Sequence, residues 1–422
     1  MQCTNKLLFS NKSADLYMLK IVRKKIISTP VLLLSIVSLF TDMASEMLYP
    51  IMPIFLQSIG YSVLLIGIIE GVAEAVAGFS KGYFGTLSDG TGKRLPFVKI
   101  GYALSAFSKP LMALFLNPAW VLTTRIIDRI GKGVRTGARD ALLSDEATPQ
   151  TKATVFGFHR SMDTIGAVLG PLLALVYLYF YPTAYRTLFL LAFAPGLLAI
   201  VATFLIKEST KNTVVNTSKT VTPFLLTHYW KKSDARYKKL VTVLLLIAVV
   251  NSSDAFLLLQ LKQIGMQDSI IIGVYILYNA VYAICAYPLG KLADGIGLKK
   301  IFIFGLLLFV LVYTGFAFNN TVWVAVLLML IYGVYAACTE GIAKAWISNV
   351  VAPTETATAL GTFGGLQSIA SMLASIIAGC IWYKLGATYC FLLTAIVVCL
   401  VIIYLLTKHF NNNILQPTHT NF

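Results

Sequence analysis

Residues 125–145, "RIIDRIGKGVRTGARDALLSD", concentrate charge in a chain that is 57% hydrophobic and only 12% charged. The charged side chains of this stretch are Arg125, Asp128, Arg129, Lys132, Arg135, Arg139, Asp140 and Asp145. At about 100° per helical residue, all except Asp145 fall within about 140° and form one stripe. A charge at the centre of a bilayer costs at least ~2.5–3.5 kcal/mol, so we expect the stripe to line a cavity that holds water, acids or a polar solute.

Further ionisable residues occur at helical spacing in the same half of the chain. Three pairs are each four residues apart, so each pair shares one helix face. They are Asp42 with Glu46, Glu70 with Glu74, and His159 with Asp163. The second half is poorer and offers Asp254, and Glu340 with Lys344. The chemistry is therefore expected mainly in the N-terminal half.

These residue types suggest two roles. A buried carboxylate changes its affinity for a proton when a cation approaches or leaves it, so we expect Arg125 or Arg129 to modulate Asp42 or Glu46. The proton-coupling candidates are Asp42, Glu46, Glu70, Glu74 and Asp163. The substrate-binding candidates are Arg125, Asp128, Arg129, Lys132 and His159, and a packed histidine is an equal interpretation of His159. The salt-bridge candidates near the end of the stripe are Arg135, Arg139, Asp140 and Asp145.

The elements that must position these residues are membrane-spanning helices. The mean hydropathy is +0.77, and a spanning helix needs about 20 mostly apolar residues. Charged or turn-rich junctions predict twelve spans, at 31–57, 62–86, 96–116, 118–143, 152–181, 186–206, 238–261, 270–291, 300–318, 320–347, 355–383 and 386–407. The predicted fold is an all-α polytopic membrane protein with twelve transmembrane helices in two pseudo-symmetric six-helix halves.

The net charge of +16 lies mostly in alternate connections. Lysine and arginine gather before the first span, after the second and eighth spans, and in the connection between the halves. The positive-inside rule therefore predicts that both termini are cytoplasmic and that the excess charge faces lipid headgroups rather than nucleic acid. The predicted parts are a basic tail (1–30), a first half (31–206), a cytoplasmic linker (207–239), a second half (240–407) and a C-terminal tail (408–422).

Two segments repeat at almost the same offset. "GTLSDGTGKR" and "TPQTKATVFGF" in the first half match "GKLADGIGLKK" and "APTETATALGT" in the second. Asp89 and Asp294 correspond in the first match, and Gly157 and Gly361 in the second. Two independent matches indicate a duplicated six-helix unit, and two such units around a central site are a transporter architecture.

The first repeat resembles the loop signature Gly-x-Leu-x-Asp-x-x-Gly-x-Lys/Arg of the major facilitator superfamily, and the resemblance extends over about residues 28–408. The signature residues are Gly85, Asp89, Gly92, Lys93 and Arg94 in the first copy, and Gly290, Asp294 and Gly297 in the second. Gly90 stands where the family usually has an arginine. The resemblance implies that Asp89 and Asp294 contact helix ends across the two halves and gate the cytoplasmic side.

The fifth predicted span carries a second signature. Gly166, Gly170 and Pro171 form a Gly-x-x-x-Gly-Pro pattern that resembles the fifth-span signature of the antiporter branch. The resemblance implies a gating role, and close packing of small residues is the alternative interpretation. The segments "SLFTDMASEMLYPIMPIFL", "IIEGVAEA" and "DRIGKGVRTGARDA" resemble a bacterial efflux-type subgroup. Pro50 and Pro53 are expected to kink the first span.

These features favour a secondary active transporter that exports a small molecule by proton-coupled alternating access in the bacterial inner membrane. An importer of an anionic metabolite or metal chelate is the alternative, and a membrane enzyme or non-transporting receptor is a third hypothesis. The sequence offers no metal-ligand cluster, nucleophile motif or phosphate-binding glycine loop, so neither enzyme activity nor a cofactor is expected. The expected partners are the solute, protons and the lipid bilayer, and the resemblance favours a monomer.

Overall fold

The computed structural model describes residues 26–49, 51–182, 184–207, 225–251 and 254–407, which form helices and no strand. The first group of helices is α2 (Thr29–Glu46), α3 (Met52–Ser58), α4 (Val63–Thr91), α5 (Leu95–Leu114), α6 (Pro118–Glu146), α7 (Lys152–Phe180) and α8 (Tyr185–Phe204). The second is α9 (Leu225–Lys232), α10 (Ala235–Val250), α11 (Ala255–Gln263), α12 (Asp268–Ile296), α13 (Leu298–Phe318), α14 (Val322–Val350), η1 (Pro353–Glu355), α15 (Thr356–Leu385) and α16 (Ala387–Leu406). The predicted all-helical class is confirmed.

The predicted spans coincide with these helices, except that two of them are broken. The first span divides into α2 and α3, and the seventh divides into α10 and α11. Pro53 lies in the first turn of α3, where a residue without an N–H removes no helical hydrogen bond. Pro50 and residues 252–253 lie outside the described residues. Within the described chain, eight helices are long and apolar enough to cross a membrane, namely α2, α7, α8, α12, α13, α14, α15 and α16.

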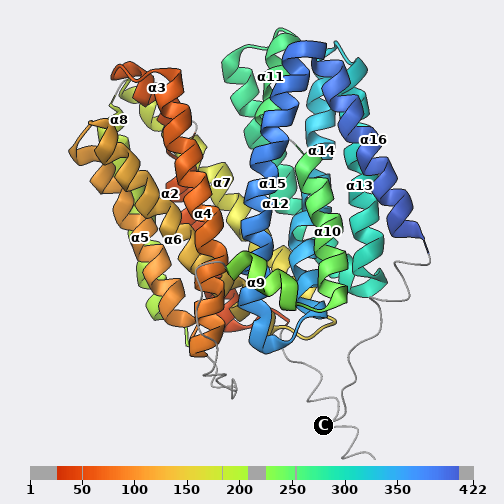
Figure 1. Ribbon diagram of the computed structural model, residues 1–422. Helices are drawn as coiled ribbons and strands as arrows, with labels where there is room; N and C mark the ends of the chain where they lie inside the picture. Colours follow the sequence, from red (N-terminus) through yellow and green to blue (C-terminus); the bar gives the residue numbers. More distant parts are fainter. Residues whose placement is uncertain (1–25, 50, 183, 208–224, 252–253, 408–422) are drawn as a thin grey trace, which may run out of the picture.

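The two groups of helices stand side by side in Figure 1, with α2–α8 on the left and α10–α16 on the right. They converge near α9 and diverge toward α3 and α11, so we call the two ends of the molecule the α9 end and the α3 end. The predicted linker is partly helical, since α9 lies within it and packs against α4 and α15. Its remainder over 208–224, the tail over 1–25 and the tail over 408–422 lie outside the described residues, so the domain boundaries remain predictions.

Two close helix crossings join the groups near the α9 end. Gly85 of α4 faces Gly361 of α15, and a Cβ built on either would lie 2.4 or 2.3 Å from a backbone oxygen of the opposite helix. Gly157 of α7 and Gly290 of α12 face each other in the same way, with corresponding distances of 2.5 and 2.3 Å. Only glycine permits helices to approach so closely. The repeated segments therefore form two equivalent crossings.

The other signature glycines end helices rather than join the groups. Gly92 ends α4 with φ of +64°, and Gly297 ends α12 with φ of +111°. Residues with a side chain rarely adopt a backbone conformation with such a positive φ, which explains why glycine occupies both positions. Gly92 and Gly297 thus serve as helix C-caps, and the gating role expected of them stays a prediction. Lys93, which follows Gly92, is exposed.

Candidate functional site

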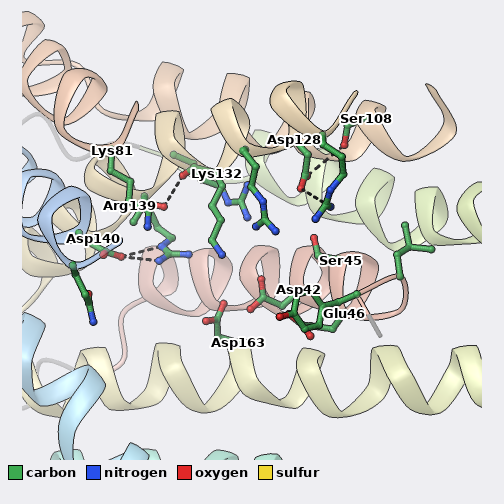
Figure 2. A pocket seen from close by; sticks show the side chains of 18 of the residues that line it. Asp42, Ser45, Glu46, Lys81, Ser108, Asp128, Lys132, Arg139, Asp140 and Asp163 are labelled. Carbon is green, nitrogen blue, oxygen red and sulfur yellow. Dashed lines mark hydrogen bonds and ion pairs between the residues drawn. The ribbon is translucent and has the colours of Figure 1, made fainter. Parts of the chain in front are cut away.

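A cavity of about 230 Å³ lies between the two groups of helices (Figure 2). The first group contributes α2, α4, α5, α6 and α7 to its wall, and α14 and α15 contribute from the second group. The ionisable residues on the wall are Asp42, Glu46, Lys81, Lys109, Arg125, Asp128, Arg129, Lys132, Arg135, Arg139, Asp140, Arg160, Asp163, Glu340 and Lys344. The charged stripe predicted on the fourth span thus faces a cavity.

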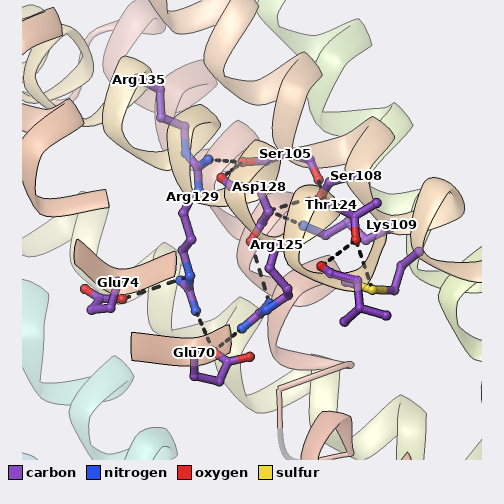
Figure 3. Close-up of polar contacts among 12 residues, drawn as sticks. Glu70, Glu74, Ser105, Ser108, Lys109, Thr124, Arg125, Asp128, Arg129 and Arg135 are labelled. Atoms are coloured by element: carbon purple, nitrogen blue, oxygen red, sulfur yellow. Dashed lines mark hydrogen bonds and ion pairs between the residues drawn. The ribbon is translucent and has the colours of Figure 1, made fainter. Parts of the chain in front are cut away.

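Two arginines of α6 are held by carboxylates of α4 (Figure 3). The Arg125 Nη2 atom lies 2.5 Å from Glu70 Oε2, and Arg129 Nη2 lies 3.9 Å from the same oxygen. Arg129 Nε lies 4.0 Å from Glu74 Oε2. Both glutamates stand behind the arginines and do not line the cavity. Because α4 packs along α6, Glu70 and Glu74 neutralise these arginines rather than present a free carboxylate to the solute.

Asp42 and Glu46 of α2 line the cavity without a basic partner. Among the described residues, no lysine or arginine nitrogen lies within 4.0 Å of either carboxylate. Oε2 of Glu46 is buried without a hydrogen-bond partner. Figure 2 shows Lys132 reaching from α6 toward α2, where Asp42 and Asp163 lie. Arg125 and Arg129 form no direct ion pair with Asp42 or Glu46 in this conformation, because both arginines lie against carboxylates of α4, and their expected influence on these acids stays a prediction.

Asp163 of α7 lies next to Asp42, close enough for the two carboxyl groups to interact electrostatically. Asp163 also accepts hydrogen bonds from Ser38 Oγ and from Arg160 Nη1, each at 2.6 Å. Two carboxylates held side by side repel each other, so such a pair is suited to holding one proton between its two members. The proton-coupling candidates Asp42 and Asp163, which are 121 positions apart in the chain, are thus brought into one site.

The structure places Arg160 on the cavity wall and His159 away from it, although the sequence pointed to His159 as a binding candidate and not to Arg160. Arg160 lines the cavity, pairs with Glu340 of the second group and donates through Nε to Tyr282 Oη at 2.5 Å. Its signal was an arginine three residues before Asp163 in an apolar span. His159 is only 3% exposed, lies off the cavity wall, and has no hydrogen-bond partner at Nε2. This position agrees with the packed-histidine interpretation.

Asp128 is turned toward α5. Lys109 Nζ donates to its Oδ1 at 2.9 Å, and Ser108 Oγ donates to the same oxygen at 3.4 Å (Figure 3). Lys109 is buried, and sequence reasoning missed it although a lysine within an apolar span is unusual. Asp128 is therefore already engaged inside the first group, which limits the substrate-binding role predicted for it.

The lower part of the stripe forms the structural salt bridges that its position suggested. Arg139 lies 2.9 Å from Asp140, and Asp140 lies 2.8 Å from Lys344 of the second group. Arg135 donates to Ser105 Oγ at 2.5 Å. Of these contacts, the pair Asp140–Lys344 joins the two groups, at the wall of the cavity.

Asp89 and Asp294 make equivalent contacts across the two groups. Asp89 accepts hydrogen bonds from the backbone N–H and the hydroxyl of Thr358, at 2.6 and 2.7 Å, at the start of α15. Asp294 accepts the corresponding bonds from Thr154, both at 2.6 Å, at the start of α7. Arg94 joins this contact through Asp89 at 3.5 Å, Asp145 at 2.8 Å and a backbone carbonyl of η1. The predicted contact with helix ends is present at both positions.

Gly166 and Gly170 lie at the α2–α7 contact inside the first group. A Cβ on Gly166 would lie 2.3 Å from Leu39 O, and one on Gly170 would lie 2.6 Å from Met43 O. Pro171 follows them inside α7 and is buried. This contact does not join the two groups, so these residues would influence gating only through the position of α2.

Comparison with known proteins identifies the family. The sequence model of the Major Facilitator Superfamily matches residues 34–276 and 255–417. The chain belongs to the major facilitator superfamily. An MFS-type transporter of Methanocaldococcus jannaschii is 32% identical over 362 residues, which cover 84% of this chain and 89% of that protein. The quinolone resistance protein NorA of Staphylococcus aureus is 25% identical over 183 residues, which cover 43% of this chain and 46% of NorA.

Solved structures show the same superfamily fold. The human organic anion transporter MFSD10 has a TM-score of 0.73 at 17% identity, covering 89% of this chain and 98% of that protein. FucP in the outward conformation has a TM-score of 0.71 at 14% identity, covering 90% of this chain and 99% of FucP. This superfamily member is therefore a multi-pass membrane transporter of small solutes and not an enzyme. Among its described residues, no group of three or more His, Cys, Asp or Glu side chains could hold a metal ion.

Proposed function

We propose that this superfamily member exports a small solute in exchange for protons by alternating access. The Asp42–Asp163 carboxyl pair carries the proposal, because two neighbouring acids on the cavity wall repel each other when both are ionised and so favour uptake of one proton. Asp163 is engaged by Ser38 and Arg160, so the proton belongs best on Asp42. Glu46, one helical turn away with a buried oxygen unsatisfied, is the second candidate.

The exchange requires that solute and proton compete for one site. A cationic or polar solute that approaches Asp42 and Glu46 favours their ionised forms, and protonation of these acids in turn weakens their attraction for it. Lys132, which reaches toward Asp42, is the cation placed to respond when the carboxylate gains or loses its proton (Figure 2). We propose that Lys132 shares the role expected of Arg125 and Arg129.

Alternating access requires a contact that breaks on one side of the membrane. We propose that the α9 end faces the cytoplasm, as the basic connections predict, and that Asp89 and Asp294 close it by holding the starts of α15 and α7. The conformation described here is then closed toward the cytoplasm. Rocking of the two groups would break both contacts and open the cavity toward the cytoplasm. The bacterial inner membrane and a monomeric state remain our predictions.

Two observations bear on the direction of transport. The Gly-x-x-x-Gly-Pro pattern and the partial similarity to a quinolone resistance protein favour export. The cavity wall carries nine basic and six acidic residues, which favours an acidic solute and keeps import of an anionic metabolite or chelate as the alternative. Lys81 supports the alternative, since its ammonium group donates to the Ser368 hydroxyl at 2.9 Å and lies within 4.0 Å of no carboxylate among the described residues.

Reconstituted transport tests the proposal. Proteoliposomes loaded with a labelled metabolite panel are given an inward or outward pH gradient, and solute movement is measured for the wild type, Asp42→Asn and Asp234→Asn. Asp234 caps α10 outside the cavity, so its substitution controls for the change of Asp to Asn. We expect gradient-driven movement against the proton flux, lost in Asp42→Asn alone. Movement with the proton flux supports import, and full gradient-driven transport by Asp42→Asn refutes coupling at this pair.

A further inference from the structure

A second cavity, of about 140 Å³, adjoins the first within the second group of helices. Glu340, Phe363 and Gln367 line both cavities, so a solute in one lies next to the other. The polar residues of the second cavity are Asn251, Asp254, Tyr278, Tyr332, Tyr335, Thr339, Glu340 and Gln367. None of its lining residues is basic, whereas nine of those in the first cavity are. The two cavities therefore offer opposite electrostatic environments.

Among the described residues, two tyrosines donate hydrogen bonds to Asp254 in this cavity. Tyr332 Oη donates to Oδ1 at 2.7 Å, and Tyr278 Oη donates to Oδ2 at 3.2 Å. In the described part of the chain, no basic nitrogen lies within 4.0 Å of this carboxylate. Although Asp254 stands at the start of α11, its side chain does not cap that helix. Neither an ion pair nor a helix cap within the described part of the chain thus explains why an acidic residue lies in this cavity.

The carboxylate can take a further ligand. Two carboxylate oxygens offer about four acceptor positions, and the tyrosines use two of them. A carboxylate in a low-dielectric site is stabilised by an opposite charge in contact with it. A cationic donor that enters this cavity would therefore find both a charge to neutralise and unused acceptor positions.

Aromatic rings surround the same position. The ring centroids of Tyr278 and Tyr332 are 5.4 Å apart, and those of Tyr332 and Tyr335 are 5.3 Å apart. Phe309 extends the cluster, with its ring 4.7 Å from that of Tyr335. The faces of such rings attract organic cations, and each contact contributes roughly 0.5–2 kcal/mol depending on desolvation. Rings beside a carboxylate are the arrangement that recognises a substituted ammonium group rather than a small metal ion, which needs several oxygen ligands.

We propose that Asp254, Tyr278, Tyr332 and Tyr335 form a binding site for an organic ammonium group of the transported solute. The site rests on the proposed transport function for its physiological meaning, but its chemistry stands on the second cavity alone. The rest of the solute reaches the first cavity past Glu340, Phe363 and Gln367. An ammonium group is attracted to the second cavity because its wall carries the acidic residues Asp254 and Glu340 and no basic residue.

Binding to the purified full-length protein in detergent tests the site without requiring transport. The probes are benzyldimethylammonium, which keeps one N–H donor, and its uncharged carbon isostere isobutylbenzene. Their binding is measured by saturation-transfer NMR and by the stabilisation of the protein against heat. We expect the wild type to bind the cation at least about tenfold more tightly than the isostere. This comparison uses the wild-type protein alone. Asp254→Asn is expected to remove that preference, and Tyr332→Leu to weaken cation binding several-fold.

Matched variants locate the effect. Asp234→Asn makes the same chemical change at another helix start and should bind like the wild type, while Tyr332→Phe keeps the ring and should retain more binding than Tyr332→Leu. Equal binding of the two probes by the wild type, or an unchanged preference in folded Asp254→Asn, would overturn the site. Proteoliposome transport separates the two proposals, because a protein that binds the cation but moves no solute contradicts the transport mechanism and leaves the site intact.

Discussion

Replacing Gly85 by alanine should open the α9 end of the molecule without unfolding it. The new Cβ would lie 2.4 Å from the carbonyl oxygen of Ala357, well inside contact distance, and the obstacle is backbone that cannot rotate away. Overpacking of this kind typically costs about 1–3 kcal/mol. That cost falls only on conformations in which α4 and α15 cross closely, so the equilibrium should shift toward separated groups by roughly 5–150-fold.

A buried cysteine can report this shift. Ser348 is 1% exposed near the end of α14, and Lys152 of the first group donates to its carbonyl at 2.5 Å. In a background without the native cysteines, Ser348→Cys should react with a maleimide only when the groups separate. We expect Gly85→Ala to raise the labelling rate by about five-fold or more, following the population shift.

Gly71 provides the matched control on the same helix. It is exposed, and a Cβ there would meet no atom within 4 Å. Gly71→Ala should therefore leave the labelling rate unchanged and slightly stabilise α4, by roughly 0.5–1 kcal/mol. If Gly85→Ala retains its fold and labels at the wild-type rate, the crossing does not gate this end, and the close approach is ordinary packing.

Three further predictions use the same reporter or thermal unfolding. Asp89→Asn keeps an acceptor but loses the charge that strengthens its bonds to Thr358, so cysteine labelling should rise roughly ten-fold while folding persists, and labelling at the wild-type rate would refute a gating role. Gly166→Ala places a Cβ 2.3 Å from Leu39 O inside one group, so it should lower the melting temperature without raising the labelling of folded protein. Arg125→Gln leaves Glu70 without its partner at 2.5 Å and should cost about 1–3 kcal/mol in a thermal unfolding assay, with a smaller loss when Glu70→Gln is added.

The sequence alone determined the parts of this protein that depend on local composition. Long apolar runs require helices in a bilayer, so the all-helical class and the positions of the helices followed from hydropathy. The stripe on α6 followed from helical periodicity, and the equivalence of Asp89 and Asp294 followed from the repeat. Each of these is a property of one segment or of two segments compared, and none requires knowledge of which helices touch.

Only the tertiary structure decided which charges meet. Arg125 was expected to modulate Asp42 or Glu46, but α4 packs along α6 and places Glu70 directly against Arg125. The amino-acid sequence does not show that Asp42 lies next to Asp163. Their proximity depends on the close packing of α2 against α7 at Gly166 and Gly170. The tyrosines around Asp254 come from α12 and α14, and helix periodicity says nothing about how separate helices are rotated toward one another. Charge pairing inside a membrane protein is set by these rotations, because a few ångströms decide whether a carboxylate meets a cation, another carboxyl group or an aromatic ring.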